Sequence, residues 1–188
     1  MIQQLAKPAL VVLAITSFLW IAYRIILYSA GKKPASSNKE LLLFFFVVYF
    51  IFVLLITLYP LPMTRVKVPG AKGVNFIPFE NMLREFSETF RRTKSYMRSH
   101  AVENIVGNIF LFIPFGILLP LISPKFRSFG KVFLFGLLFS LAIETLQLVS
   151  RQLGVYRSVD VDDVILDVVG AICGFIVYRL FRITAHDS

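Results

Sequence analysis

Residues 41–59 read LLLFFFVVYFIFVLLITLY, and no side chain among them is charged. A helix needs about 20 mostly apolar residues to cross the hydrocarbon core of a bilayer, which is roughly 30 Å thick. This stretch is close to that length. It therefore predicts a transmembrane helix.

Four more apolar stretches have a similar length. They lie on both sides of residues 41–59 and cover residues 8–29, 105–122, 132–149 and 164–180. In chain order, residues 8–29 are the first stretch and residues 41–59 the second. Backbone N–H and C=O groups inside lipid must bond to one another, and the alternating pattern of barrel strands is absent here. The sequence therefore predicts an all-α integral membrane protein, a bundle of about five transmembrane helices.

The composition agrees with a membrane protein. Hydrophobic residues make up 57% of the chain and charged residues 16%, with a mean hydropathy of +0.75. A soluble domain needs more charge to cover its surface. The net charge of +9 comes largely from cations beside apolar stretches, which suit anionic lipid headgroups, so no nucleic-acid partner is expected. The single cysteine, Cys173, excludes an intramolecular disulfide.

One connection between the apolar stretches is long, at residues 60–103. Within it, residues 79–97 carry apolar side chains at helical spacing, namely Phe79, Met82, Leu83, Phe86 and Phe90. Arginine, lysine and glutamate residues lie among them. This pattern predicts an amphipathic helix on the membrane surface, although a helix packed against the end of the bundle has the same pattern.

Cations near the ends of the apolar stretches predict the orientation. In a five-span chain, one membrane side holds a group of cations next to helix ends: Lys32, Lys33, Lys39, Lys125, Arg127, Lys131, Arg179 and Arg182. These short connections predict that this side is cytoplasmic, which puts the N-terminus outside and the C-terminus in the cytoplasm. The cations of the long connection lie on the other side and favour the opposite orientation.

Polar side chains inside apolar stretches are costly, so they are candidates for function. Two amides four residues apart, Asn104 and Asn108, share one helix face at the start of the third stretch. Three acids, Asp160, Asp163 and Asp167, follow one face into the fifth stretch. Both groups are expected to collect at one membrane face.

The same end of the bundle is expected to collect the remaining polar groups. Glu144 and Gln147 lie near the end of the fourth stretch. The third stretch starts on the membrane side where the fourth ends and the fifth begins, so these groups converge at one membrane face. The long connection, with Asn75 and Phe79, opens on that face too.

Small residues predict where helices approach closely. Gly170 and Gly174 have the small-xxx-small spacing that lets another helix pack against a backbone. Gly107, beside Asn108, is expected to do the same.

A purely structural interpretation of the polar groups is also open. Arg151 or Arg157 would then pair with an aspartate, and the amides would join helices by hydrogen bonds. Asp162 and Asp163 would be solvated acids near a helix N-terminus. Function is favoured for the set as a whole, because Glu144 and Asp167 lie inside apolar stretches, where a lone charge costs about 2.5–3.5 kcal/mol.

Four strings follow one another along the chain: VNFIPFE (74–80), ENIVGNIFLFIPFGILLP (103–120), SLAIETLQ (140–147) and RSVDVDDVILDVVGAICG (157–174). Together they resemble the VanZ-like family, which is named for a membrane protein associated with teicoplanin resistance. The resemblance covers roughly residues 42–177. It implies that the family-pattern positions are Asn104, Asn108, Pro114, Gly116, Glu144, Gln147, Arg157, Asp160, Asp163 and Gly170.

The chain departs from the family in two ways. Where the family commonly has asparagine, this chain has Asp167, which adds an acid. The first apolar stretch lies outside the resemblance. We therefore expect an extra N-terminal transmembrane helix and polar turn at residues 1–40, a VanZ-like membrane domain at residues 41–182, and a C-terminal tail at residues 183–188.

The resemblance implies a multi-pass protein of a bacterial cell membrane that lowers susceptibility to glycopeptide or lipoglycopeptide antibiotics. A polar site at the outer membrane face would engage the drug or a cell-envelope lipid. Candidate partners are membrane lipid, a lipoglycopeptide antibiotic, a lipid-linked cell-wall intermediate and a second copy of the chain. The expected ligand-binding residues are Asn75, Phe79, Asn104, Asn108, Glu144, Gln147, Arg157, Asp160, Asp163 and Asp167.

The alternative is a membrane enzyme that acts on a lipid-linked envelope intermediate. Glu144, Asp160 and Asp163 are then the candidate catalytic groups. No cofactor is expected, but a divalent cation would take oxygen ligands from Glu144, Asp160, Asp163 and Asp167. No known catalytic signature is present, so enzymatic activity stays open. A small transporter is a third alternative, and the lack of an inverted repeat disfavours it.

Overall fold

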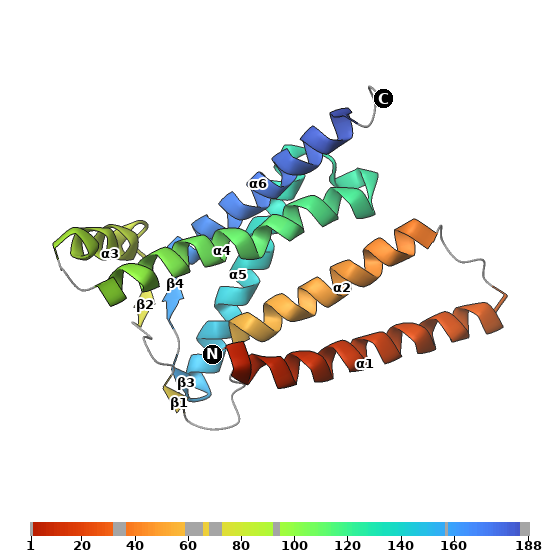
Figure 1. Ribbon diagram of the computed structural model, residues 1–188, viewed down its shortest axis with the longest axis horizontal. Helices are drawn as coiled ribbons and strands as arrows, with labels where there is room; N and C mark the ends of the chain where they lie inside the picture. The colour runs from red at the N-terminus through yellow and green to blue at the C-terminus, as the bar shows by residue number, and fades with distance from the viewer. Residues whose placement is uncertain are drawn as a thin grey trace. The chain divides into compact units, whose positions relative to one another are not determined.

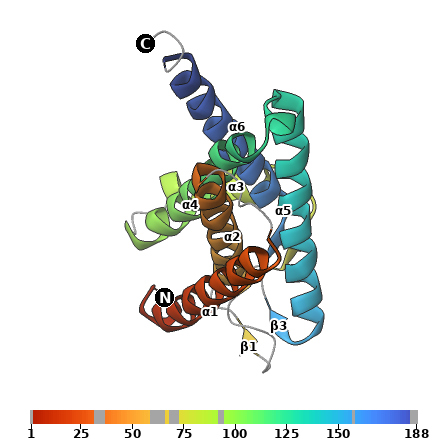
Figure 2. The same ribbon diagram turned by 90° about the vertical axis from the view of Figure 1, so that its right-hand side faces the viewer.

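The computed structural model describes residues 2–31, 37–58, 66–67, 73–91, 95–156 and 158–184. In these residues the chain forms α1 (Ile2–Ser29), α2 (Ser37–Leu58), β1 (Val66–Lys67), β2 (Val74–Asn75), α3 (Glu80–Arg91), α4 (Ser95–Ile122), the short 3-10 helix η1 (Pro124–Phe126), α5 (Phe129–Gln152), β3 (Val155–Tyr156), β4 (Val159–Asp160) and α6 (Val161–Thr184). The predicted all-α membrane fold is confirmed. Figures 1 and 2 show the helices from two directions.

Among the described residues, four helices are long and apolar enough to cross a membrane: Asn38–Leu58, Asn104–Ile122, Phe129–Gln152 and Val161–Arg182. They contain the second to fifth apolar stretches. The first stretch forms most of α1, but its apolar part, Leu13–Ser29, is shorter than the other four. A fifth crossing by α1 therefore stays a prediction.

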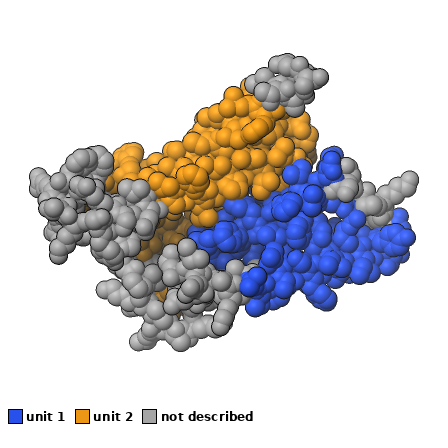
Figure 3. All heavy atoms as spheres, viewed as in Figure 1, with its two compact units in different colours: residues 1–59 blue, residues 60–188 orange. Residues whose placement is uncertain are grey.

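The chain divides into two compact units, residues 1–59 and residues 60–188 (Figure 3). Unit 1 consists of α1 and α2. Trp20 of α1 lies edge-on against Phe44 of α2, with ring centroids 5.6 Å apart. Arg24, the charge that interrupts the first apolar stretch, forms an ion pair with Glu40. The pair brings two opposite charges together between helices that are largely apolar.

In unit 2, α4 and α6 run side by side (Figures 1 and 2). Glycines allow this close packing. A Cβ added to Gly170 would overlap the backbone of Ile109, and a Cβ added to Gly174 would overlap the backbone of Ile113. Gly116 of α4 faces the α6 backbone in the same way. The predicted close approach at Gly170 and Gly174 is confirmed, and α4 is the partner.

The prediction for Gly107 is wrong. A Cβ added there would meet nothing within 4 Å, because this residue lies on an exposed face of α4. Being small is not enough for a helix contact, since the residue must also point at the neighbouring helix.

Aromatic side chains fill the space between α4 and α5. Phe112 is fully buried, and its ring centroid lies 5.3 Å from that of Phe139. Phe115 stacks on Phe139 at 5.4 Å. Large apolar side chains elsewhere on α4, α5 and α6 are exposed, among them Phe110, Leu138 and Ile176. This inside-out pattern suits helices that face lipid.

The long connection differs from its prediction at one point. The amphipathic segment was expected to be one helix over residues 79–97, but α3 ends at Arg91 and α4 already begins at Ser95. On α3, Leu83 is 64% exposed beside the exposed Arg84. An apolar and a cationic side chain that both face outward suit a helix at the membrane surface.

Two pairs of short parallel strands tie this connection to the segment between α5 and α6. β1 pairs with β3, and β2 pairs with β4. In the second pair Asn75 is the register partner of Asp160. Figure 1 shows that α3, β2 and β4 lie at the end of unit 2 where α6 begins.

Three expectations involve residues outside the described set. They are the polar turn before α2, the last residues of the predicted tail at 183–188, and the ligand role of Arg157. The predicted domain boundary after residue 40 also stays a prediction.

The glycine packing gives a testable outcome. Gly170→Ala should lower the melting temperature of the detergent-solubilised protein by about 5–10 °C, because overpacking costs about 1–3 kcal/mol and each kcal/mol shifts the Tm of a chain this size by about 2–4 °C. Gly107→Ala is the matched control and should not lower the Tm, since its new methyl group meets open space. Equal Tm values for the two variants would contradict the packing.

Candidate functional site

The site begins with a backbone hydrogen bond between the long connection and β4, which directly precedes α6. The backbone N–H of Val159 donates to the Gly73 carbonyl at 3.0 Å. Gly73 has a φ of 113°, in the region that favours glycine. The strand pair that follows brings Asn75 next to Asp160, although the two are far apart in the sequence.

Asp160 is the centre of the site. Its Oδ1 accepts from Asn75 Nδ2 and from the backbone N–H of Asp162, both at 3.0 Å. Its Oδ2 accepts from Asn81 Nδ2 at 2.6 Å. Its own backbone N–H donates to Glu144 Oε2 at 3.0 Å. Asp160 thus caps the N-terminus of α6 and joins it to β2, α3 and α5.

Asp162 caps a different helix from its own. Its carboxylate accepts from the backbone N–H groups of Phe79 and Met82, at the N-terminus of α3. A carboxylate is favoured there, because the first N–H groups of a helix have no partner within it. Phe79 has a φ of 66°, an unfavourable value for a residue with a Cβ. The two bonds to Asp162 help hold that conformation.

Asp163 faces α4. Its Oδ1 accepts from Asn108 Nδ2 at 2.6 Å and from Asn104 Nδ2 at 3.3 Å. The two amides lie one helical turn apart and reach the same carboxylate oxygen. The shared helix face that their spacing predicted is confirmed.

Asp167 lies deeper in the bundle and faces α5. Its Oδ2 accepts from the Ser140 hydroxyl at 2.6 Å. Ser140 is fully buried and Asp167 is 5% exposed. The acid that departs from the family pattern therefore has a hydrogen-bonding partner in a neighbouring helix.

We call these side chains the polar cluster: Asn75, Asn81, Asn104, Asn108, Ser140, Glu144, Asp160, Asp162, Asp163 and Asp167. The structure brings together seven of the ten predicted ligand-binding residues in this cluster. Phe79 contributes its backbone N–H, and its side chain is 46% exposed. Gln147 lies half-buried on α5, one turn beyond Glu144. The predicted convergence of α4, α5 and α6 is therefore confirmed, while the ligand role of these residues stays a prediction.

Three members of the cluster escaped the sequence analysis as site residues. Asn81 lies directly after the string VNFIPFE, and Ser140 lies one turn before Glu144 on the same helix face. Asp162 lies beside the row of acids and was considered as a solvated acid in the structural interpretation, which is wrong because Asp162 is 4% exposed. A search for small polar residues one turn from each acid would have found Ser140.

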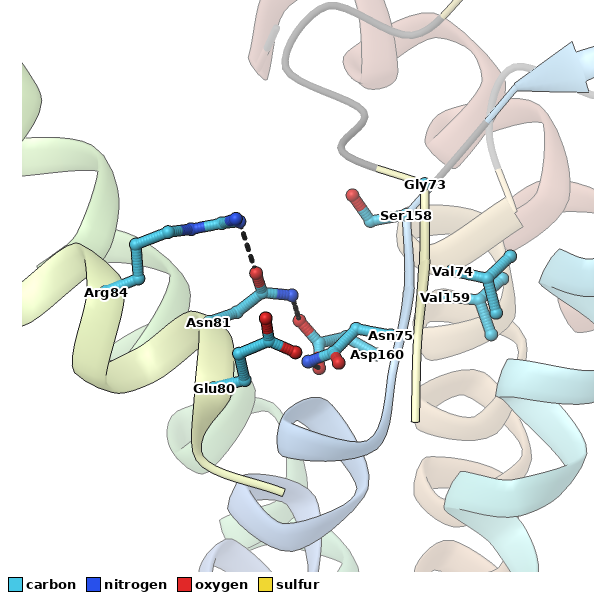
Figure 4. Close-up of a pocket in the computed structure, with 9 residues that line it drawn as sticks. All are labelled: Gly73, Val74, Asn75, Glu80, Asn81, Arg84, Ser158, Val159 and Asp160. Atoms are coloured by element: carbon cyan, nitrogen blue, oxygen red, sulfur yellow. Dashed lines mark hydrogen bonds between the residues drawn. The ribbon is translucent and has the colours of Figure 1, made fainter. Parts of the chain in front are cut away.

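A small polar pocket opens beside Asp160 (Figure 4). Its volume is about 130 Å³. Its polar residues come from β2, from α3 and from residues 158–160, and they are Asn75, Glu80, Asn81, Arg84, Ser158 and Asp160. Arg84 donates to the Asn81 side-chain oxygen, and Asn81 in turn donates to Asp160. Figure 4 shows this chain of contacts across the pocket.

Metal binding was considered for four of the acids. Among the residues that the structure describes, no three His, Cys, Asp or Glu side chains are grouped in a way that would hold a metal ion. Glu144, Asp160 and Asp163 instead accept hydrogen bonds from backbone or amide N–H groups.

Comparison with known proteins gives one match. A family model described as VanZ/LLP1 matches residues 46–182. This range nearly coincides with the one deduced from the four strings and leaves out α1. Searches of curated proteins and of solved structures find no match.

The cap formed by Asp162 gives a second testable outcome. Asp162→Ala removes the acceptor for the Phe79 and Met82 amides, and losing a helix cap costs about 1 kcal/mol, so these amides should exchange with solvent roughly five to ten times faster. Hydrogen–deuterium exchange read by mass spectrometry on peptides from residues 79–91 measures this change. Asp163→Ala is the matched control and should leave α3 unchanged. Equal acceleration in both variants would rule out the cap.

Proposed function

The chain belongs to the VanZ/LLP1 family, and from this we propose that it is a membrane factor that lowers susceptibility to glycopeptide antibiotics of the teicoplanin type. In this proposal it acts by engaging a cell-envelope lipid at the polar pocket beside Asp160. The family match and four membrane-length helices support the membrane setting.

The size of the pocket favours a lipid headgroup over the drug itself. Pockets that enclose drug-sized ligands usually measure about 300–1,000 Å³. The pocket beside Asp160 measures about 130 Å³, so it suits a small polar headgroup. This is the observation on which the choice between drug and lipid rests.

The surroundings of the pocket also favour a lipid. Phe76 and Ile77 lie between β2 and α3, and they are 74% and 61% exposed. Exposed Phe and aliphatic side chains are typical of segments that lie in the membrane–water interface. A lipid with its headgroup in the pocket would place its acyl chains beside such residues.

The charge pattern favours an outer position for the pocket. Exposed cations lie in the connection between α4 and α5 and in the first turn of α5, at the opposite end of these helices, and include Lys125, Arg127 and Lys131. Short connections rich in Lys and Arg usually stay in the cytoplasm. We therefore propose that the pocket faces outward, towards the cell wall, where glycopeptides act.

The enzyme alternative receives less support. A general acid or base must reach a substrate, yet Asp160 and Asp162 are 8% and 4% exposed and hold the framework together. Glu144 is also 8% exposed and bonds to the start of α6. These acids are better suited to positioning the pocket than to chemistry in it.

Susceptibility measurements test the proposal. A glycopeptide-susceptible Gram-positive strain that expresses the chain should need about fourfold more teicoplanin for growth inhibition, whereas Arg84→Ala should return it towards the empty-vector value, because a lost charge-assisted hydrogen bond weakens binding by an order of magnitude. Lys131→Ala also removes one exposed cation, but at the opposite end of α5, and should keep the wild-type value.

Membrane levels of all three proteins are compared on the same cultures. No increase in the teicoplanin requirement with the wild-type chain would contradict the resistance role. If the Arg84→Ala variant raised the teicoplanin requirement as much as the wild-type chain does, the pocket would not be needed for resistance.

A further inference from the structure

The charged groups of the pocket are not equivalent. Asp160, at its base, accepts hydrogen bonds on both carboxylate oxygens and is nearly buried. Glu80 and Arg84 lie at its mouth and are both exposed. A ligand that enters the pocket therefore meets Glu80 and Arg84 first.

Glu80 and Arg84 carry opposite charges four residues apart on α3. Side chains at this spacing lie on the same face of a helix and often pair. In the described part of the chain, Glu80 and Arg84 form no ion pair with each other. Arg84 instead turns to the Asn81 side-chain oxygen, which lies between the two charges (Figure 4).

This arrangement separates an acceptor from a donor at the pocket mouth. A guanidinium presents a planar set of N–H donors that suits a phosphate group. A carboxylate suits an ammonium group, which has donors only. A ligand that carries both a phosphate and an ammonium a few bonds apart satisfies the two side chains together.

The apolar residues beside the mouth indicate where such a ligand comes from. Phe79 and Leu83 flank Glu80 and Arg84 in the sequence and are 46% and 64% exposed. An amphipathic helix with this exposure lies at the level of lipid headgroups. A headgroup in the membrane is therefore within reach of the pocket, while its acyl chains stay in the hydrocarbon layer.

From this geometry we infer that the pocket binds a zwitterionic lipid headgroup of the phosphoethanolamine type, with its phosphate on Arg84 and its ammonium on Glu80. The inference rests on the proposed function, because it names the class of lipid that the same pocket engages. It assigns a ligand role to Glu80 and Arg84, neither of which the sequence analysis selected.

Native mass spectrometry of the full chain in detergent tests the inference. The protein is titrated with phosphatidylethanolamine or with phosphatidylglycerol of identical acyl chains, which keeps the phosphate and lacks the ammonium. The wild-type chain should bind phosphatidylethanolamine about fivefold more tightly, the upper end of what one exposed ion pair contributes.

Two variants separate the roles of the charged residues. Glu80→Gln keeps the shape of the side chain and should abolish the preference between the two lipids. Arg84→Ala should weaken the binding of both lipids. Lys131→Ala should match the wild-type chain, which controls for the loss of one cation. A melting temperature within the wild-type range confirms that each variant is folded.

Several results would overturn the inference. They are equal binding of the two lipids to the wild-type chain, an unchanged preference in Glu80→Gln, or binding of soluble glycerophosphoethanolamine as tight as that of the lipid. The last result would assign the pocket to a free headgroup. If teicoplanin susceptibility changes as proposed but the lipid preference is absent, only this inference fails. If the preference is present without any change in susceptibility, only the resistance role fails.

Discussion

The carboxylate of Asp160 is the constraint on which the rest of unit 2 depends. It stands at the N-terminus of α6 and accepts hydrogen bonds from Asn75, Asn81 and its own helix, while its backbone bonds to Glu144 on α5. A carboxylate that is removed from water is tolerated only with such partners. The need to satisfy one buried acid therefore fixes the positions of β2, α3 and α5 at a single end of the bundle. Asp163, one turn further, extends the same arrangement to α4.

Much of this arrangement follows from spacing along single helices. Asn104 and Asn108 share a face because they are four residues apart, and the same argument places Asp160, Asp163 and Asp167 in one row. Gly170 and Gly174 are also four residues apart, and they mark the surface of α6 that contacts α4. Gly107 is equally small but faces away from the neighbouring helix. The spans and the convergence of polar groups were predictable in this way. Whether a glycine faces the neighbouring helix was not predictable, because this depends on how the two helices are rotated relative to each other.

The contacts that define the pocket could not be deduced from spacing. Asp162 caps α3, which lies about eighty positions earlier, and Asn81 reaches Asp160 over a similar separation. Only tertiary structure pairs a helix N-terminus with an acid on another helix. The end of α3 at Arg91 was also missed, although the last apolar residue of the helical pattern is Phe90 and the polar sequence RRTKS follows it. The structure thus divides the polar residues into two groups. Buried acids form a framework, and Glu80 and Arg84 remain at the mouth of the pocket for a ligand.

The central claim is that the long connection and the start of α6 form one polar site at the outer membrane face. Labelling of single cysteines on intact cells with a membrane-impermeant maleimide tests it most directly, in a chain whose only native cysteine is replaced by Cys173→Ala. The account predicts that Val74→Cys and Ser158→Cys are labelled on intact cells, whereas Lys131→Cys is labelled only after the membrane is made permeable. Labelling of Val74→Cys and Ser158→Cys from different sides of the membrane would contradict the shared site. If both cysteines were labelled only after the membrane is made permeable, the outward orientation of the site would be contradicted.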